Sequence, residues 1–243
     1  MAETPRPAFY AARRGGWHDW WTVLHPPYTA WHLSYVVLGA SLAPRVQVSR
    51  MLATLLAFFL AVGIAAHCLD ELHGRPLRTL IPARALVGAT LVSLAGAVAI
   101  GALGVATVGA VLIPFIVVGP LLVIAYNAEL LGGVVHTDAG FALAWGAFPV
   151  LTAYAAQAGT LALAPALAAL GAFALSWAQR SLSTPARTLR RSVRAVDGAL
   201  TMADGTARQL DERFLLAPLE RALRAMSWGM VTLAAAVAVA RLT

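Results

Sequence analysis

The residues best suited to chemistry lie close together between Ala65 and Arg78, where a long apolar run gives way to polar sequence. The ionisable side chains in this stretch are His67, Asp70, Glu71, His73, Arg75 and Arg78. Because His67, Asp70 and His73 recur at three-residue steps, a helix would place all three on one face. Imidazole and carboxylate ligands together suit Zn²⁺ or Fe²⁺. The spacing indicates a transition-metal site, with a hydrated helix end paired to the nearby arginines as the plainer interpretation.

Further polar residues could join this site from other parts of the chain. Glu129, His136 and Asp138 are the candidates for extra metal ligands. His25 and His32 flank the opening turns of the first long apolar segment. A haem pair would need a partner helix, so interfacial hydrogen bonding is the expected role of these two histidines.

The composition describes an integral membrane protein. Of the 243 residues, 60% are hydrophobic and only 12% are charged, whereas a soluble domain carries about 25% charged residues. No apolar segment follows the polar first 16 residues, so no cleavable signal peptide is expected. The single Cys68 excludes an internal disulfide. The net charge of +7 indicates contact with anionic membrane lipids, and no nucleic acid partner is expected.

Apolar runs predict an all-α polytopic protein with about seven transmembrane helices. The first span is expected to begin after Pro26 and Pro27, which end an interfacial helix rich in Trp. Spans three and four are expected to join through a short turn at Gly104 to Thr107. The expected spans are residues 28–43, 51–69, 86–104, 106–126, 139–158, 161–178 and 226–242. The chain then divides into an N-terminal interfacial segment (1–27), a six-helix core (28–180), an amphipathic segment (181–225) and a final span (226–243).

The segment between the sixth and last spans is expected to be an amphipathic helix on one membrane face. Its apolar residues Leu189, Val193, Val196 and Leu200 recur at three- and four-residue steps. A second stretch with the same pattern runs from Leu210 to Leu223. This segment could lie on anionic headgroups, cover a polar cavity or dock a partner.

Charge placement orients the predicted bundle. With seven spans, 15 of the 18 basic residues, all of them Arg, lie on the face that holds the N-terminus. The positive-inside rule makes that face cytoplasmic. The expected location is a bacterial-type inner (plasma) membrane, crossed several times, with the N-terminus in the cytoplasm. The stretch from Ala65 to Arg78 lies on the same face.

Four motifs, taken in chain order, resemble the UbiA superfamily of intramembrane prenyltransferases. Residues 65–75 (A-A-H-C-L-D-E-L-H-G-R) stand where that family ends its second helix with an aspartate-rich motif. Y-N-A-E-L at 126–130 precedes H-T-D-A-G-F-A-L-A-W-G-A-F-P-V-L-T-A-Y-A-A-Q-A-G at 136–159, which is similar to the fifth helix of naphthoate-type members. Q-R-S-L-S-T-P-A-R-T-L-R at 179–190 occupies the place of the second aspartate-rich motif.

The resemblance implies a UbiA-like bundle and a set of site residues. Asp70 and Glu71 would hold Mg²⁺ as catalytic carboxylates, because the family binds a prenyl diphosphate through Mg²⁺. Arg75, Arg78 and Arg180 would contact phosphate, and Glu129 would lie near the acceptor. The same resemblance assigns ligand contacts to Tyr126, Tyr154 and Gln157.

The second aspartate-rich motif departs from the family pattern. Ser181 and Pro185 stand where the family carries its two aspartates, and Arg180 matches a family basic residue. Without paired carboxylates the diphosphate and Mg²⁺ sites are degenerate. The expected function is therefore binding of a lipidic ligand (a prenyl lipid, quinone or pigment) or service as a subunit of a larger membrane complex. The alternative is an active prenyltransferase that moves a polyprenyl group from its diphosphate to an aromatic or lipid acceptor.

Overall fold

The computed structural model describes residues 7–243, which form an all-α bundle with one small β-hairpin. Within these residues, five helices are long and apolar enough to cross a membrane. They are Val48–Leu72, Ala83–Val108, Ala110–Asn127, Asp138–Ala158 and Glu212–Leu242. The predictions of an all-α fold and of a multi-pass membrane protein are confirmed, with five candidate spans in place of the expected seven.

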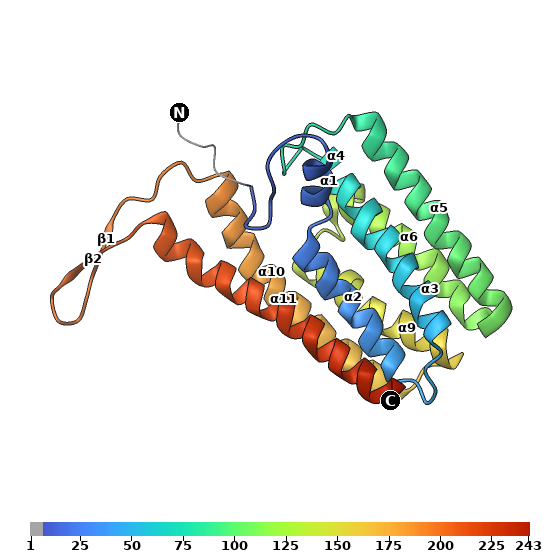
Figure 1. The fold of residues 1–243 in the computed structure, drawn as a ribbon. Helices are drawn as coiled ribbons and strands as arrows, with labels where there is room; N and C mark the ends of the chain where they lie inside the picture. The colour runs from blue at the N-terminus through green and yellow to red at the C-terminus, as the bar shows by residue number, and fades with distance from the viewer. Residues whose placement is uncertain (1–6) are drawn as a thin grey trace.

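The other two expected spans correspond to α2 (Pro26–Ser41) and to the first part of α10 (Leu163–Arg191). α2 has 16 residues, about 24 Å of helix, against a hydrocarbon thickness of about 30 Å. It lies within the bundle, between α9 (Phe148–Ala158) and α11 (Glu212–Leu242) (Figure 1). Trp31, Tyr35 and Val36 of α2 are completely buried. α2 is thus a central packing helix of the bundle.

Two helices contain π-helical turns in their middle. α3 (Val48–Phe58) passes through η1 (Phe59–Ala66) into α4 (His67–Leu72), and α8 (Asp138–Ala142) passes through η3 (Leu143–Ala147) into α9. A π turn inserts an extra residue and turns the following side chains around the helix axis, and such turns are frequent at functional sites. Both π segments contribute residues to the cavities described below.

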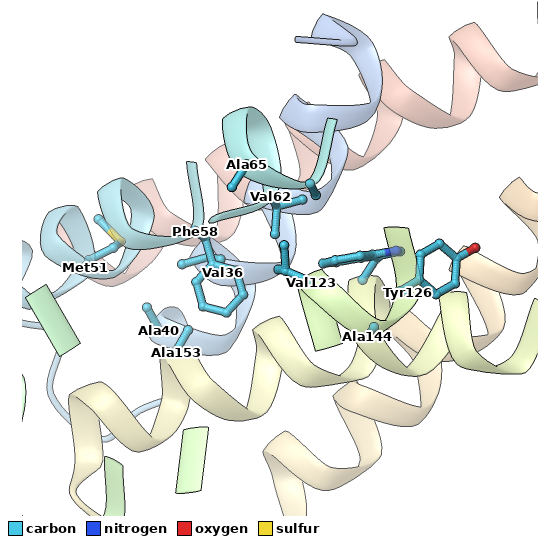
Figure 2. Close-up of a cluster of buried hydrophobic side chains, with 12 residues drawn as sticks. Val36, Ala40, Met51, Phe58, Val62, Ala65, Val123, Tyr126, Ala144 and Ala153 are labelled. Atoms are coloured by element: carbon cyan, nitrogen blue, oxygen red, sulfur yellow. The ribbon is translucent and has the colours of Figure 1, made fainter. Parts of the chain in front are cut away.

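The interior of the bundle contains small side chains and several apolar clusters, one of which is drawn in Figure 2. Side chains of Val36, Phe58, Val62 and Val123, from four different helical segments, gather in this cluster (Figure 2). At Gly146 a Cβ would lie 2.6 Å from the carbonyl oxygen of Ala172. η3 and α10 therefore approach so closely that only glycine fits at the crossing.

α5 (Ala83–Val108) and α6 (Ile113–Asn127) form the expected hairpin, joined through the short 3-10 turn η2 (Ala110–Leu112). The turn lies later than predicted. α5 continues through Gly104 to Val108, and the chain reverses at Gly109, whose φ of 116° suits only glycine. The predicted turn at 104–107 is wrong because residues such as Val105 and Ala106 extend the helix.

The predicted amphipathic helix is correct only at its two ends. α10 ends at Arg191, and Leu200 lies in strand β1 (Ala199–Thr201), which pairs antiparallel with β2 (Ala207–Gln209). Asp-Gly pairs at 197–198 and 204–205 favour turns over helix, and both glycines have positive φ. The second stretch is helical, but it is continuous with the last span in one helix, α11. The hairpin projects away from the bundle (Figure 1).

The N-terminal Trp cluster forms the short helix α1 (Trp17–Val23). Trp17 and Trp21 are 68% and 47% exposed, as an interfacial helix requires. The Asp19 carboxylate accepts from the backbone N–H of Gly15 at 3.0 Å and of Leu80 at 2.8 Å. These bonds fasten α1 to the loop that follows α4.

Candidate functional site

A polar cavity of about 290 Å³ lies at the end of the bundle where α4 and α10 finish. We call this end the polar end. The cavity is lined by the N-terminal segment and by residues of α2, α4, α6, η3 and α10. Its charged or imidazole-bearing wall residues are His25, His32, His67, Asp70, His73, Glu129, His136, Arg180, Arg187, Arg190, Arg191 and Glu220. The cavity is therefore rich in groups that bind anions.

Two histidines stack on one side of this cavity. The rings of His25 and His67 lie 4.2 Å apart between centroids and are inclined by 17°. The Nδ1 atom of His67 lies 3.1 Å from the carbonyl oxygen of Gly63 in η1, and the Nε2 atom of His25 has no hydrogen-bond partner among the described residues. Burial, and then the neighbouring His67, lower the pKa of His25 well below its ordinary value.

The predicted metal site of His67, Asp70 and His73 is wrong. Within residues 7–243, no three His, Cys, Asp or Glu side chains are placed to share an ion. α4 ends at Leu72, and the backbone of His73 leaves the helix with ψ of 88°. His73 then lies 3.6 Å from Glu129 instead of facing Asp70. His67 is held against His25, so the helical spacing that predicted the site does not extend over all three residues.

Mg²⁺ also does not fit the residues present. The carboxylates that line the cavity are Asp70, Glu129 and Glu220. Glu129 lies beside two histidines, and Glu220 is paired with Arg190. Octahedral Mg²⁺ needs hard oxygen ligands that converge on one point, and only Asp70 is without an ion pair in the described structure.

Glu71, predicted as a catalytic carboxylate, has a structural role. Its side chain is completely buried and does not line the cavity. One oxygen accepts from the backbone N–H of Leu77 at 2.9 Å, and the other accepts from the N–H and hydroxyl of Thr79 at 2.9 and 2.8 Å. The prediction failed because Glu71 lies about 100° around the helix from Asp70, and so it faces the loop while Asp70 faces the cavity.

The two predicted phosphate ligands that follow α4 belong to the same loop. Arg75 has φ of 53° and donates from Nη1 to the carbonyl oxygen of Ile81 at 2.7 Å. Arg78 has φ of 56° and is exposed. Neither residue lines the polar cavity, so neither is placed to bind a ligand there.

Arg180, Tyr126 and Glu129, three of the predicted site residues, lie together at the cavity. The Nε of Arg180 donates to the Asp138 carboxylate at 3.0 Å, and its guanidinium carbon lies 6.0 Å from the centre of the Tyr126 ring. His136 stacks on Tyr126 with 4.4 Å between ring centroids and lies 3.8 Å from Glu129. The hydroxyl of Tyr126 is buried without a hydrogen-bond partner in the described residues.

Tyr154 and Gln157, the remaining predicted ligand contacts, lie outside the polar cavity. The Gln157 amide accepts from the backbone N–H of Gln47 at 2.8 Å and donates to its carbonyl oxygen at 3.1 Å. Gln47 precedes α3, so this pair lies at the opposite end of the bundle. Tyr154 is buried within α9. Gln157 therefore fastens the loop between α2 and α3.

The sequence interpretation missed the N-terminal segment. Tyr10 packs edge-on against Tyr28 and Phe9, with 5.5 and 5.2 Å between ring centroids. Its burial raises the pKa of the Tyr10 phenol. Arg191 donates to the carbonyl oxygen of Pro7 at 3.3 Å. The adjacent aromatic residues Phe9 and Tyr10, in an otherwise polar N-terminal segment, were the sequence feature that could have indicated that this segment covers the cavity.

A second, apolar cavity of about 440 Å³ lies between α3, α5, α6 and α9. It extends from Arg50 and Thr107 at the far end of the bundle to Val62 and Trp145, which also line the polar cavity. Val62 and Trp145 therefore form a wall that the two cavities share.

The fold and the cavities define a multi-pass membrane protein with a polar cavity, lined by arginine, histidine and carboxylate side chains, next to an apolar one. Comparison with protein-family models, curated proteins and solved structures gave no match.

Proposed function

We propose that this protein binds a long-chain lipidic ligand, whose polar head occupies the polar cavity and whose tail occupies the apolar cavity. The observation that carries the proposal is that the two cavities adjoin, with Val62 and Trp145 lining both of them. Small-molecule sites are mostly apolar pockets with a few placed polar groups. The proposal includes a UbiA-like bundle of about seven spans, in which α2 crosses as a short helix enclosed by its neighbours. It also includes a cytoplasmic polar end, and it favours a prenyl-type or other single-chain lipid.

The charges of the polar cavity support binding over diphosphate chemistry. Metal-ion stabilisation of a diphosphate leaving group is worth several kcal/mol, and Mg²⁺ does not fit the carboxylates of this cavity. Arg180 is engaged with Asp138 and Arg190 with Glu220. The arginines are thus held in defined positions around a head group rather than around a metal cluster.

The proposal is tested by native mass spectrometry of the protein released from its own membrane in mild detergent. We expect a bound lipid on the wild-type protein. Ala97→Trp should displace it, because Ala97 lines the apolar cavity. Ala99→Trp is the matched control, since Ala99 is exposed on the same helix and outside both cavities. A lipid-free wild-type protein, or equal lipid retention by both variants, would contradict the proposal.

A further inference from the structure

Three buried polar atoms without hydrogen-bond partners among the described residues line the polar cavity. They are Nε2 of His25, the hydroxyl oxygen of Tyr126 and Oε1 of Gln179. Gln179 is 2% exposed, and no hydrogen bond joins its amide to any described residue. Buried polar groups of folded proteins are almost always paired. These atoms therefore point to a ligand that supplies hydrogen bonds at this place.

The Gln179 amide restricts what that ligand carries. An amide presents a carbonyl acceptor and an N–H donor, whichever way it is turned. A phosphate or a quinone oxygen accepts hydrogen bonds and cannot satisfy the carbonyl. A hydroxyl both donates and accepts, so it can pair with either side of the amide.

Gln179 begins a row of cavity residues spaced four apart along α10. The row continues through Ser183 and Arg187 to Arg191, all of which line the cavity. Residues four apart share one face of a helix. Neither Arg187 nor Arg191 forms an ion pair with a described residue: Arg187 donates to the Thr184 hydroxyl at 3.2 Å, and Arg191 donates to a backbone carbonyl. These two arginines are available for an anion.

Gln179 is the residue of this row nearest to the apolar cavity, and the arginines lie further away. η3, which holds Trp145, crosses α10 at the level of Ala172 and Ser176, because the Cβ of a residue at position 146 would touch both. Gln179 lies one turn beyond that crossing and Arg187 two turns further. A ligand whose tail passes Trp145 therefore meets the amide before the guanidinium groups.

One head group can bridge Gln179 and Arg187 when the reach of the arginine and a hydrogen bond of about 3 Å at each end are included. Gln179 and Arg187 are eight residues apart, about 12 Å along the helix. Both side chains lean toward the helix N-terminus, but the longer arginine reaches further back, since its Nη2 donates to the hydroxyl of Thr184 at 3.2 Å. That leaves room for a hydroxyl and a phosphate on neighbouring carbons.

We propose that the polar cavity recognises a single-chain lipid with one phosphate and a hydroxyl between the phosphate and the tail, as in a monoacyl glycerophosphate. This proposal rests on the proposed function and names its ligand class. Arg187 and Arg191 bind the phosphate, and the Gln179 amide binds the hydroxyl. A diphosphate is disfavoured because the described carboxylates beside these arginines do not form a Mg²⁺ site. One apolar cavity leads away from the head, which suits one tail.

The test compares two lipids that differ by one hydroxyl. 1-Oleoyl-lysophosphatidate and 3-(oleoyloxy)propyl phosphate share the chain and the phosphate, and only the first has the hydroxyl. Affinities are measured for the detergent-purified full chain by native mass spectrometry titration. We expect lysophosphatidate to bind about five- to tenfold more tightly, the usual effect of one hydrogen bond to a buried group.

Substitutions assign this difference to residues. Gln179→Leu should abolish the preference for the hydroxyl while both lipids still bind. Arg187→Gln should weaken both lipids about tenfold or more, as expected for a lost charge-assisted contact. Arg194→Gln is the control, because Arg194 is exposed beyond the end of α10 and does not line the cavity.

The outcomes separate this inference from the proposed function. Equal affinity of the wild-type protein for the two lipids would overturn the hydroxyl assignment and leave lipid binding in place. Tighter binding of farnesyl diphosphate with Mg²⁺ would overturn the single-phosphate assignment. Glycerol 3-phosphate binding as tightly as lysophosphatidate would show that the ligand is soluble. Failure of every lipid to bind would overturn both proposals.

Discussion

Removing the carboxylate of Glu71 should destabilise the protein without removing a ligand contact. Glu71→Ala leaves the N–H groups of Leu77 and Thr79 and the Thr79 hydroxyl without an acceptor in a buried place. Hydrogen bonds to a charged group contribute about 1.5–3 kcal/mol each, and the hydroxyl can turn to another partner. We therefore expect a loss of about 3–5 kcal/mol in the free energy of unfolding.

The assay is the apparent Tm of the detergent-purified protein, measured by intrinsic tryptophan fluorescence. A loss of 1 kcal/mol lowers Tm by about 2–4 °C in a protein of this size, so Glu71→Ala should lower it by about 10 °C. Glu71→Gln keeps one acceptor oxygen, so its Tm should lie between those of the wild-type protein and Glu71→Ala. Asp70→Asn is the control, since the Asp70 side chain has no hydrogen bond or ion pair among the described residues and its backbone carbonyl, which accepts from His73, is kept. An unchanged Tm for Glu71→Ala, together with lost ligand binding, would refute the structural role.

Two further predictions concern groups that line the polar cavity. Asp70→Asn should strengthen the binding of 1-oleoyl-lysophosphatidate about three- to tenfold in native mass spectrometry titration, because it removes the negative charge that faces Arg187; weaker binding would instead assign Asp70 to the ligand. Since burial lowers the pKa of His25, the unfolded chain binds the extra proton below its ordinary pKa of about 6.5. The contribution of His25 to the free energy of unfolding should therefore be fully present above that pH. It should fall as the pH drops below it, by at most about 1.4 kcal/mol per pH unit. His25→Phe keeps the stack on His67 and should reduce the slope of the Tm profile between pH 5 and 8, with the remaining slope due to the other histidines. Identical slopes in both proteins would contradict this account.

Hydropathy and proline placement were enough to find the helices, and they were insufficient where local polar chemistry decides the backbone. α2 begins at Pro26 as expected, because proline suits the first turn of a helix. The apolar period between Leu189 and Leu200 predicted a helix, and the turn-forming Asp197 and Gly198 prevent one. The spacing of apolar residues does not reveal the π segments η1 and η3, because each inserts only one residue into an otherwise helical sequence.

The sequence predicted where the candidate site lies, but only some of the residues that form it. Arg180, Tyr126, Glu129 and Asp70 all line the polar cavity, because each lies near the polar end of its helix. Helical spacing could not show that Glu71 faces a loop. That assignment depends on residues 77–79 returning to the helix, a tertiary contact with no trace in the local pattern.

The arrangement of charges around Asp70 bears on how such a cavity can work without a metal. A carboxylate pair draws a cation, and a diphosphate then binds to the cation. Here the acidic residues that could have formed such a pair are engaged elsewhere: Glu220 with Arg190, and Glu129 beside His73 and His136. What is left around Asp70 is positive charge from Arg187 together with neutral groups, the buried Gln179 amide and the stacked histidines. On the proposal made above, such a cavity binds an anion directly, and its selectivity lies in the hydrogen bonds beside the charge, because the arginines alone would accept any phosphate.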